Sequence, residues 1–210
     1  MNARAALLCM AVVASLTLTA AGLGACGRSR TGTPVASPSV SAAAADRQAA
    51  QMYFASLEPI VERDYQIQAR LNAAGAAFDT ATDPFDRQIW ERFAQALSDT
   101  LPDAQRVLAG YQSVKPPAAF AAAHALLVQI NQMSLKAARG VIANMKSMKP
   151  IKDWALQAMA EGNAQSAPAD RMLAEFRSAA ARVGLQPPAR LLAIYSDQSA
   201  TPSANSQPSV

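Results

Sequence analysis

The 210-residue chain contains few residues of the types that usually carry chemistry. It has two cysteines and one histidine, and only 16% of its residues are charged. Cys9 and Cys26 both lie near the N-terminus, so the rest of the chain has no thiol for a disulfide bond, a metal site or a nucleophile. A domain built from residues after Cys26 must therefore be stabilised by its hydrophobic core alone.

Glycine and aromatic residues are also scarce. The chain has nine glycines and 6% aromatic residues, whereas 51% of its residues are hydrophobic and many of these are alanine. This composition favours helices over strands and argues against an all-β fold. The net charge of +4 is small and scattered, so nucleic acid is not an expected partner.

The first 25 residues have the organisation of a signal peptide. Arg4 provides the positive start, and residues 5–18 form an apolar stretch that is too short to span a membrane. The next segment, Leu23-Gly24-Ala25-Cys26, resembles the lipobox of bacterial lipoproteins. The resemblance implies cleavage between Ala25 and Cys26 and attachment of diacylglycerol to the Cys26 thiol. The alternative is an ordinary secretory signal followed by a chance cysteine.

The same resemblance implies a location in the cell envelope. A diacylglyceryl group with an amide-linked acyl chain buries many methylene groups at about 0.8 kcal/mol each, which is enough for stable anchoring. We therefore expect an extracytoplasmic protein attached to a membrane by its N-terminal lipid. In an organism with two membranes, the sorting rule of the family implies the periplasmic side of the outer membrane, because Gly27 is not the aspartate that retains lipoproteins at the inner membrane.

Two segments have the composition of disordered chain. Residues 26–45 start with the lipidated cysteine and continue with small and polar residues, with Pro34 and Pro38 among them. We expect this segment to be a flexible tether that spans on the order of 25 Å. Residues 196–210 have the same character and are expected to form a disordered tail.

The intervening residues, 46–195, show the pattern of four helical arms. Apolar residues recur at spacings of three and four in each arm, which is typical of packed helices. The turn signals between the arms are evenly spaced and fall at residues 80–84, 113–117 and 149–153. The predicted fold is therefore all-α, an up-down-up-down four-helix bundle with short loops.

Capping residues mark the ends of these arms. Asp46 is a suitable N-cap for the first arm, Asp83 for the second, and Gly184 a suitable C-terminal stop for the fourth. The fourth arm has the weakest pattern, because Gly162 and Pro168 interrupt it.

A polar layer is predicted halfway along the bundle, with Asp64 on the seam of the first arm. Counting from the turns brings Ser98, Ser134 and Pro168 to about the same height. The seam positions at this height are also polar or small, namely Asp64, Asn131, Ser134, Gly162 and Gln165. A buried carboxylate is costly, so such a layer must close its own hydrogen bonds, hold water or hold a ligand. The candidate ligand-binding residues are Asp64, Asn131, Ser134 and Gln165. Alternatively, Val61 and Tyr65 turn inward and leave Asp64 half exposed.

His124 is the remaining candidate for a binding site. It lies on the apolar face of the third arm, and the height count places Arg106 and Glu175 near it. A general base needs a nucleophile beside it, and a metal site needs further nitrogen or sulfur ligands. The alternative is a purely structural histidine that caps a helix or packs at the edge of the core. We assign no catalytic residue, no metal ligand and no cofactor.

Residues 114–127 are similar to a pattern in uncharacterised exported bacterial helical-bundle lipoproteins. A proline pair opens a helix and is followed by a histidine and leucines, as in Val114-Lys115-Pro116-Pro117-Ala118-Ala119-Phe120-Ala121-Ala122-Ala123-His124-Ala125-Leu126-Leu127. This resemblance covers fourteen residues and implies no activity.

The expected function is that of a non-enzymatic, membrane-anchored envelope lipoprotein that serves as a binding or scaffold module. Its expected partners are the membrane, through the lipid, and an envelope protein or a small ligand. The alternative is a bundle that binds a metal through His124 and methionines, because thioethers suit Cu(I), or a small ligand in the layer around Asp64. Methionine at seam positions such as Met145 also fills irregular space in a core.

Overall fold

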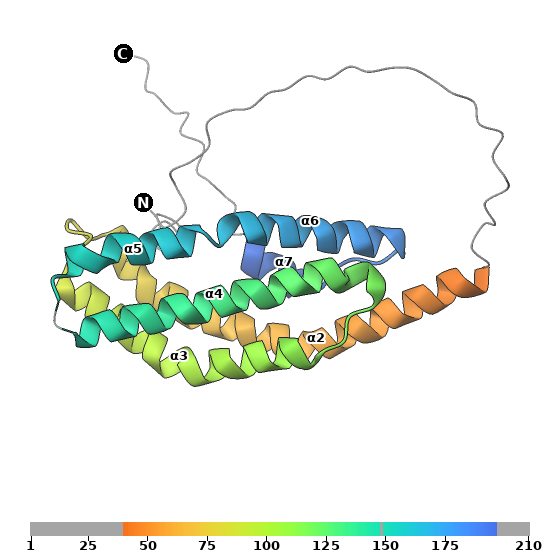
Figure 1. Ribbon diagram of the computed structural model, residues 1–210, viewed down its shortest axis with the longest axis horizontal. Helices are drawn as coiled ribbons and strands as arrows, with labels where there is room; N and C mark the ends of the chain where they lie inside the picture. Colours follow the sequence, from red (N-terminus) through yellow and green to blue (C-terminus); the bar gives the residue numbers. More distant parts are fainter. Residues whose placement is uncertain (1–39, 148, 197–210) are drawn as a thin grey trace, which may run out of the picture.

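A computed structural model describes residues 40–147 and 149–196 (Figure 1). The predicted signal peptide, its cleavage site at Ala25, the lipidation site at Cys26, and most of the predicted tether and tail lie outside these residues. The described residues form helices and no strand, which confirms the all-α class. None of the described helices has both the length and the apolar character required to cross a membrane.

Three long helices run through the whole body of the molecule. They are α2 (Val40–Gly75), α3 (Arg87–Ser113) and α4 (Ala121–Lys146). Short 3-10 turns, η1 (Ala76–Asp79) and η2 (Ala118–Phe120), lie in the connections between them. The chain reverses direction from each long helix to the next, and α3 packs against both α2 and α4 (Figure 1).

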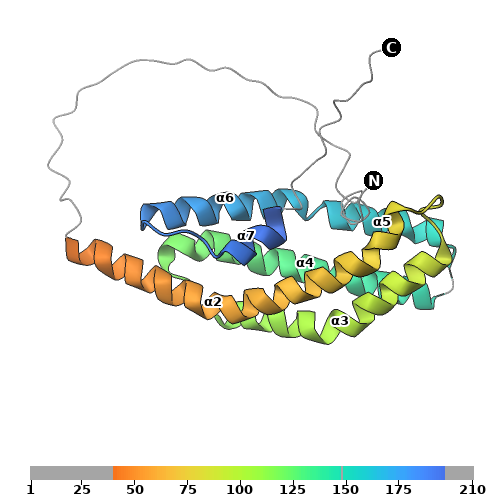
Figure 2. The ribbon, with the colours of Figure 1, turned by 180° about the vertical axis from the view of Figure 1, so that it is seen from behind.

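The fourth side of the molecule consists of two helices, and a fifth short helix is added to it. α5 (Ile151–Asn163) and α6 (Ser166–Arg182) follow one another along α4, and α7 (Ala189–Ser196) packs between α2 and α6 (Figure 2). The prediction of four unbroken arms is therefore not confirmed in that form. The predicted interruption is present, since Gly162 and Pro168 flank the division between α5 and α6.

Two of the three predicted helix boundaries were wrong. α2 begins at Val40, so Asp46 lies inside the helix, and residues 40–45 are helical rather than part of the tether. This segment is rich in alanine, the strongest helix former. The N-cap of α3 is Asp86, whose Oδ1 accepts hydrogen bonds from the backbone N–H groups of Gln88 (2.7 Å) and Ile89 (3.4 Å). Asp83 instead closes a turn by accepting from the N–H of Phe85.

The predicted stop at Gly184 is confirmed. Gly184 has a φ of +65°, a conformation that costs glycine no steric strain. Its N–H donates to the carbonyl of Ala181 (3.1 Å), and the N–H of Leu185 donates to the carbonyl of Ala180 (2.9 Å), which is the Schellman arrangement. The predicted tail is shortened by one residue, because Ser196 belongs to α7.

The buried apolar residues form two separate cores. The larger one, here named the α6 core, combines α2, α3, α4, α6 and α7, and its largest fully buried members are Leu57, Tyr111, Phe120, Leu127, Ile130, Met172, Phe176 and Leu191. The smaller one, the α5 core, lies at the opposite end and consists of Trp90, Phe93, Ala94, Leu97, Val141, Ile151, Trp154, Ala155 and Ala158. The three long helices pack against both cores, whereas α5 contributes only to the α5 core and α6 only to the α6 core.

Candidate functional site

Asp64 is buried on α2, with 3% of its surface exposed. The hydroxyl groups of Tyr111 on α3 and Tyr195 on α7 both donate to its Oδ2, each over 3.1 Å. None of the ion pairs formed by described residues involves this carboxylate. Burial raises the pKa of Asp64 to about 6, although hydrogen bonds from Tyr111, Tyr195 and Gln68 act in the opposite direction. The alternative in which Asp64 is half exposed is therefore wrong.

Asn131 reaches Asp64 through a tyrosine. Its Nδ2 donates to the hydroxyl oxygen of Tyr195 (3.0 Å) and to the carbonyl of Leu127 (2.9 Å). Because the hydroxyl of Tyr195 accepts from Asn131 and donates to Asp64, the three groups form a directed chain. Burial raises the pKa of Tyr195 and of Tyr111 well above the ordinary tyrosine value, so both hydroxyls keep their protons.

Ser134 and Gln165 form a separate pair in the same layer. The hydroxyl of Ser134 lies 2.6 Å from Oε1 of Gln165 and 3.0 Å from the carbonyl of Ile130, and its single proton serves one acceptor at a time. Gln165 occupies the break between α5 and α6. The predicted layer thus exists, but it is divided into two hydrogen-bonded groups. Ser98, which was placed at this height, is exposed, and Thr100 is buried instead.

A small cavity adjoins this layer between α2, α3 and α4. Its volume is about 60 Å³, and its polar lining consists of Asp64, Gln68, Thr100, Asn131 and Ser134. The remaining lining is apolar and includes Ile67, Leu97 and Leu135. Since a water molecule needs roughly 10 to 15 Å³ of such space, the cavity can hold a few waters or a ligand of similar size. A drug-sized ligand needs several hundred Å³ and does not fit.

His124 lies on α4 and has a structural role, because it hydrogen-bonds the C-terminal end of α3. Its Nε2 donates to the carbonyl of Tyr111 (3.0 Å), one of the last carbonyls of that helix, and its Nδ1 accepts from the hydroxyl of Tyr53 (2.9 Å). Burial lowers the pKa of His124, which favours this neutral form. Both ring nitrogens are therefore occupied. Arg106, which the height count placed near His124, pairs with Asp103 instead.

The geometry gives no support to the hypothesis that His124 and methionines bind a metal ion. Among the described residues, no cluster of three or more histidine, cysteine, aspartate or glutamate side chains could hold a metal ion. Three of the methionines pack in the cores: Met172 is fully buried in the α6 core, and Met145 and Met159 contact the α5 core. They occupy the packing role that methionine usually has in helical proteins.

The tyrosines are the site residues that the sequence pattern did not identify. Tyr53 and Tyr111 fit the apolar spacing of the first and second arms. A buried tyrosine hydroxyl needs a hydrogen-bond partner, and this need could have indicated that both tyrosines belong to a polar network. Tyr195 lies in α7, where no helix was predicted.

The chain matches no model of a known protein family, and no curated protein and no solved structure shows significant similarity to it.

Proposed function

We propose that the chain is a lipoprotein of the cell envelope, cleaved after Ala25 and lipidated at Cys26, with a non-enzymatic binding or scaffold module behind the anchor. The observation that carries this proposal is the Leu23-Gly24-Ala25-Cys26 segment, placed directly after an apolar stretch of signal-peptide length. The module is a four-sided antiparallel bundle in which α5 and α6 together form the fourth arm. In an organism with two membranes, it lies on the periplasmic side of the outer membrane.

The hydrogen bonds of the polar residues favour a structural role over catalysis. A serine nucleophile needs a neighbouring base, yet Ser134 contacts an amide oxygen of Gln165 and a backbone carbonyl. His124 has no free nitrogen with which to accept a substrate proton. Asp64 is held by two tyrosine hydroxyls. These contacts support the non-enzymatic proposal.

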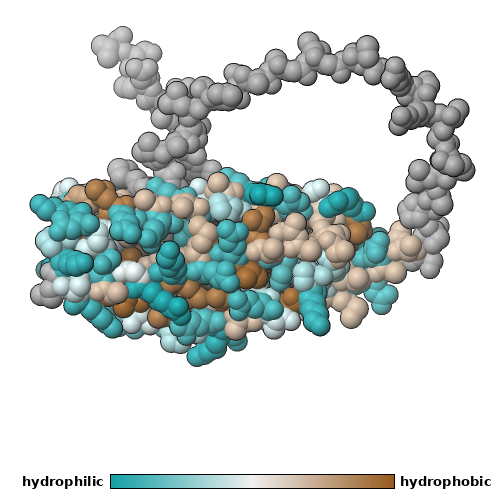
Figure 3. Space-filling view, viewed as in Figure 1, coloured by the Kyte–Doolittle hydropathy of each residue, from teal (hydrophilic) through white to brown (hydrophobic). Residues whose placement is uncertain are grey.

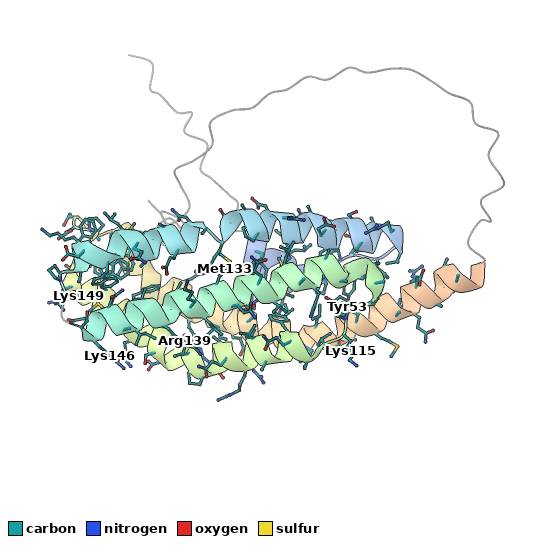
Figure 4. All side chains as sticks on the ribbon, viewed as in Figure 1. Tyr53, Lys115, Met133, Arg139, Lys146 and Lys149 are labelled. Atoms are coloured by element: carbon teal, nitrogen blue, oxygen red, sulfur yellow. The ribbon has the colours of Figure 1, made fainter. Side chains whose placement is uncertain are left out.

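A surface groove between α3 and α4 supports a binding role. Its volume is about 360 Å³, which lies within the usual range for ligand sites. Leu108 and Leu135 provide apolar walls, and Lys136 and Arg139 provide positive charge at one side. Figure 4 shows Arg139 on α4 where that helix faces α3. The apolar residues visible in Figure 3 are otherwise scattered among hydrophilic ones. The groove suits a ligand or an envelope protein segment that carries a carboxylate or phosphate group.

The second candidate function is the binding of a small ligand in the polar layer. The cavity beside Asp64 favours it, because a buried carboxylate faces space that is large enough for a few atoms. Nucleic acid remains outside the proposed partners, since the net charge of the chain is only +4.

Metabolic labelling with a fatty-acid analogue tests the anchor. The wild-type protein and the control Cys9→Ser should both incorporate the label, because Cys9 lies in the segment that is removed. Cys26→Ser should incorporate none and should keep its leader, because the acceptor thiol is absent. Label in Cys26→Ser, or a wild-type protein without label, would overturn the proposal.

A further inference from the structure

The carboxylate of Asp64 is a buried negative charge without a positive partner among the described residues. Tyr111 and Tyr195 donate to the same oxygen, Oδ2, so neither of them occupies Oδ1. Gln68, one helical turn further along α2, supplies an additional polar contact. Hydrogen bonds from neutral groups stabilise a buried carboxylate only in part, whereas a cation beside it would offset the desolvation directly.

The cavity next to Asp64 has room for such a cation but for little more. Its 60 Å³ correspond to a few atoms, and it lies in the gap between the two cores. Half-buried residues from all three long helices, Gln68, Leu101 and Ala138, contribute to its walls, so a small solute can reach it from the surface.

The lining determines which class of cation fits. Hard metal cations such as Na⁺ or Ca²⁺ take about six or more oxygen ligands. Most of the side chains that line the cavity are leucine, isoleucine, valine or alanine. An ammonium group needs only three or four acceptors, and a methyl group attached to it packs well against aliphatic side chains. The side-chain oxygens in this lining that can act as acceptors belong to Asp64, Gln68, Thr100, Asn131 and Ser134.

We propose that this cavity binds a small ammonium ion, either ammonium itself or a short primary alkylammonium such as methylammonium, with the carboxylate of Asp64 as its counter-ion. The proposal deepens the second candidate function, small-ligand binding, and it does not depend on the lipid anchor. The fatty-acid experiment and the experiment below can therefore fail independently of each other.

Thermal unfolding of the purified full-length protein tests the proposal. Methylammonium chloride is compared at neutral pH with NaCl, KCl and tetramethylammonium chloride, all at the same ionic strength. A ligand that binds only the folded protein raises Tm, by roughly 3 to 6 °C at tenfold excess over Kd for a domain of this size. We expect this rise with methylammonium and not with tetramethylammonium, which is too large for the cavity and has no N–H group.

Three variants assign the effect to the cavity. Asp64→Asn keeps the shape of the side chain and should abolish the methylammonium-specific rise, whereas Asp46→Asn removes the same charge from an exposed position of α2 and should retain it. Ala104→Val keeps the carboxylate and fills part of the cavity, so it should also weaken the effect, and it replaces Asp64→Asn as the deciding variant if that protein does not fold.

Three outcomes would overturn the proposal. An equal rise with all four salts would indicate a general salt effect. A rise with Na⁺ or K⁺ alone would indicate a metal cation. The absence of any rise specific to methylammonium would leave water as the occupant of the cavity.

Discussion

The two cores of this bundle differ in size and in the way they treat polar groups. The α6 core contains 20 buried residues, and the α5 core contains nine, so the α6 half provides most of the apolar burial. Buried hydroxyls in the α6 core are hydrogen-bonded, as in the contact of Tyr53 with His124. The α5 core depends on aromatic rings packed edge to face, and Trp90 and Trp154 lie 5.0 Å apart at 75°. In this smaller core, Nε1 of Trp154 is buried without a hydrogen-bond partner.

This difference shows where a helical bundle can accommodate a buried charge. Asp64 lies at the edge of the larger core, where helices on several sides supply hydroxyl donors. The break between α5 and α6 lies at the same level, because Gln165 of the break contacts Ser134 of the polar layer. The boundary between the cores, the break between α5 and α6 and the polar layer therefore coincide. We expect the two halves to respond differently to substitution.

The largest effect is expected in the α6 core. Phe176 is fully buried, and its ring lies 6.1 Å from that of Phe120 and 6.5 Å from that of Tyr53. Phe176→Ala should lower the free energy of unfolding by about 3 to 5 kcal/mol, measured by urea denaturation. Phe93→Ala, in the α5 core, is the matched control. It should lower the free energy of unfolding by less, because the smaller α5 core can collapse more easily into the space that the ring leaves. An equal or larger loss for Phe93→Ala would contradict the ranking of the two cores.

An intermediate effect is expected from the ionisation of Asp64. Its pKa in the folded protein is about 6, above the ordinary value of 3.8. A raised carboxyl pKa means that the stabilising contribution is complete below about pH 4 and is lost as the pH rises through 6. The loss at neutral pH is about 2 to 3 kcal/mol. The facing tyrosines Tyr111 and Tyr195 stay neutral throughout this range, because their pKa values are raised well above 10.

Asp64→Asn isolates this contribution from that of His124, which has a lowered pKa and therefore favours the folded protein at higher pH. Urea unfolding of both proteins between about pH 4 and pH 7.5 should show the variant gaining stability relative to the wild type as the pH rises. If the difference between them is the same at every pH, Asp64 does not titrate in this window, and burial does not raise its pKa to about 6.

The smallest effect is expected in the α5 core. Trp154→Phe removes an indole N–H that has no acceptor. Removing this unpaired donor stabilises the folded protein, which offsets part of the stability lost with the smaller ring. We expect a change within about 1 kcal/mol of zero. Trp90→Phe is the comparison, because it also removes the hydrogen bond from Nε1 of Trp90 to the carbonyl of Pro84 (2.8 Å), and it should cost about 1 kcal/mol more. The reverse order in the urea midpoints would show that Trp154 has a polar partner after all.

Apolar periodicity was sufficient to predict the helical class, because the spacing of three and four recurs in every arm. It also placed Asp64 on the inward seam of the first arm, but it left the half-exposed alternative open, and only the structure excludes that alternative. The partners of Asp64 could not be predicted in the same way. The connection between α2 and α3 covers residues 76–86 and includes the predicted turn at residues 80–84. The height count assumed that the two helices run symmetrically away from that turn and placed Ser98 level with Asp64, whereas the side chain of α3 that reaches Asp64 is Tyr111.

Tyr195 illustrates a second limit of sequence reasoning. α7 has eight residues, and a helix of this length is not stable in isolation. It forms because Leu191, Ile194 and Tyr195 pack against the rest of the bundle, and Arg190 pairs with Glu62 on α2. A local sequence pattern does not predict such a helix, because its stability comes from contacts with helices that are distant in the sequence.

The length of α2 fixes the direction in which the chain leaves the domain. Its first buried residue is Ala50, and residues 42–49 are exposed on a helix that extends past the end of the α6 core (Figure 1). At 1.5 Å per residue, residues 40–49 form a rigid spacer of about 15 Å. Under the proposed anchor, this spacer holds the point where the flexible tether joins the domain about 15 Å beyond the α6 core. The α6 end is therefore nearer to the lipid along the chain, and the α5 end, with its Trp90 and Trp154, is farther from it.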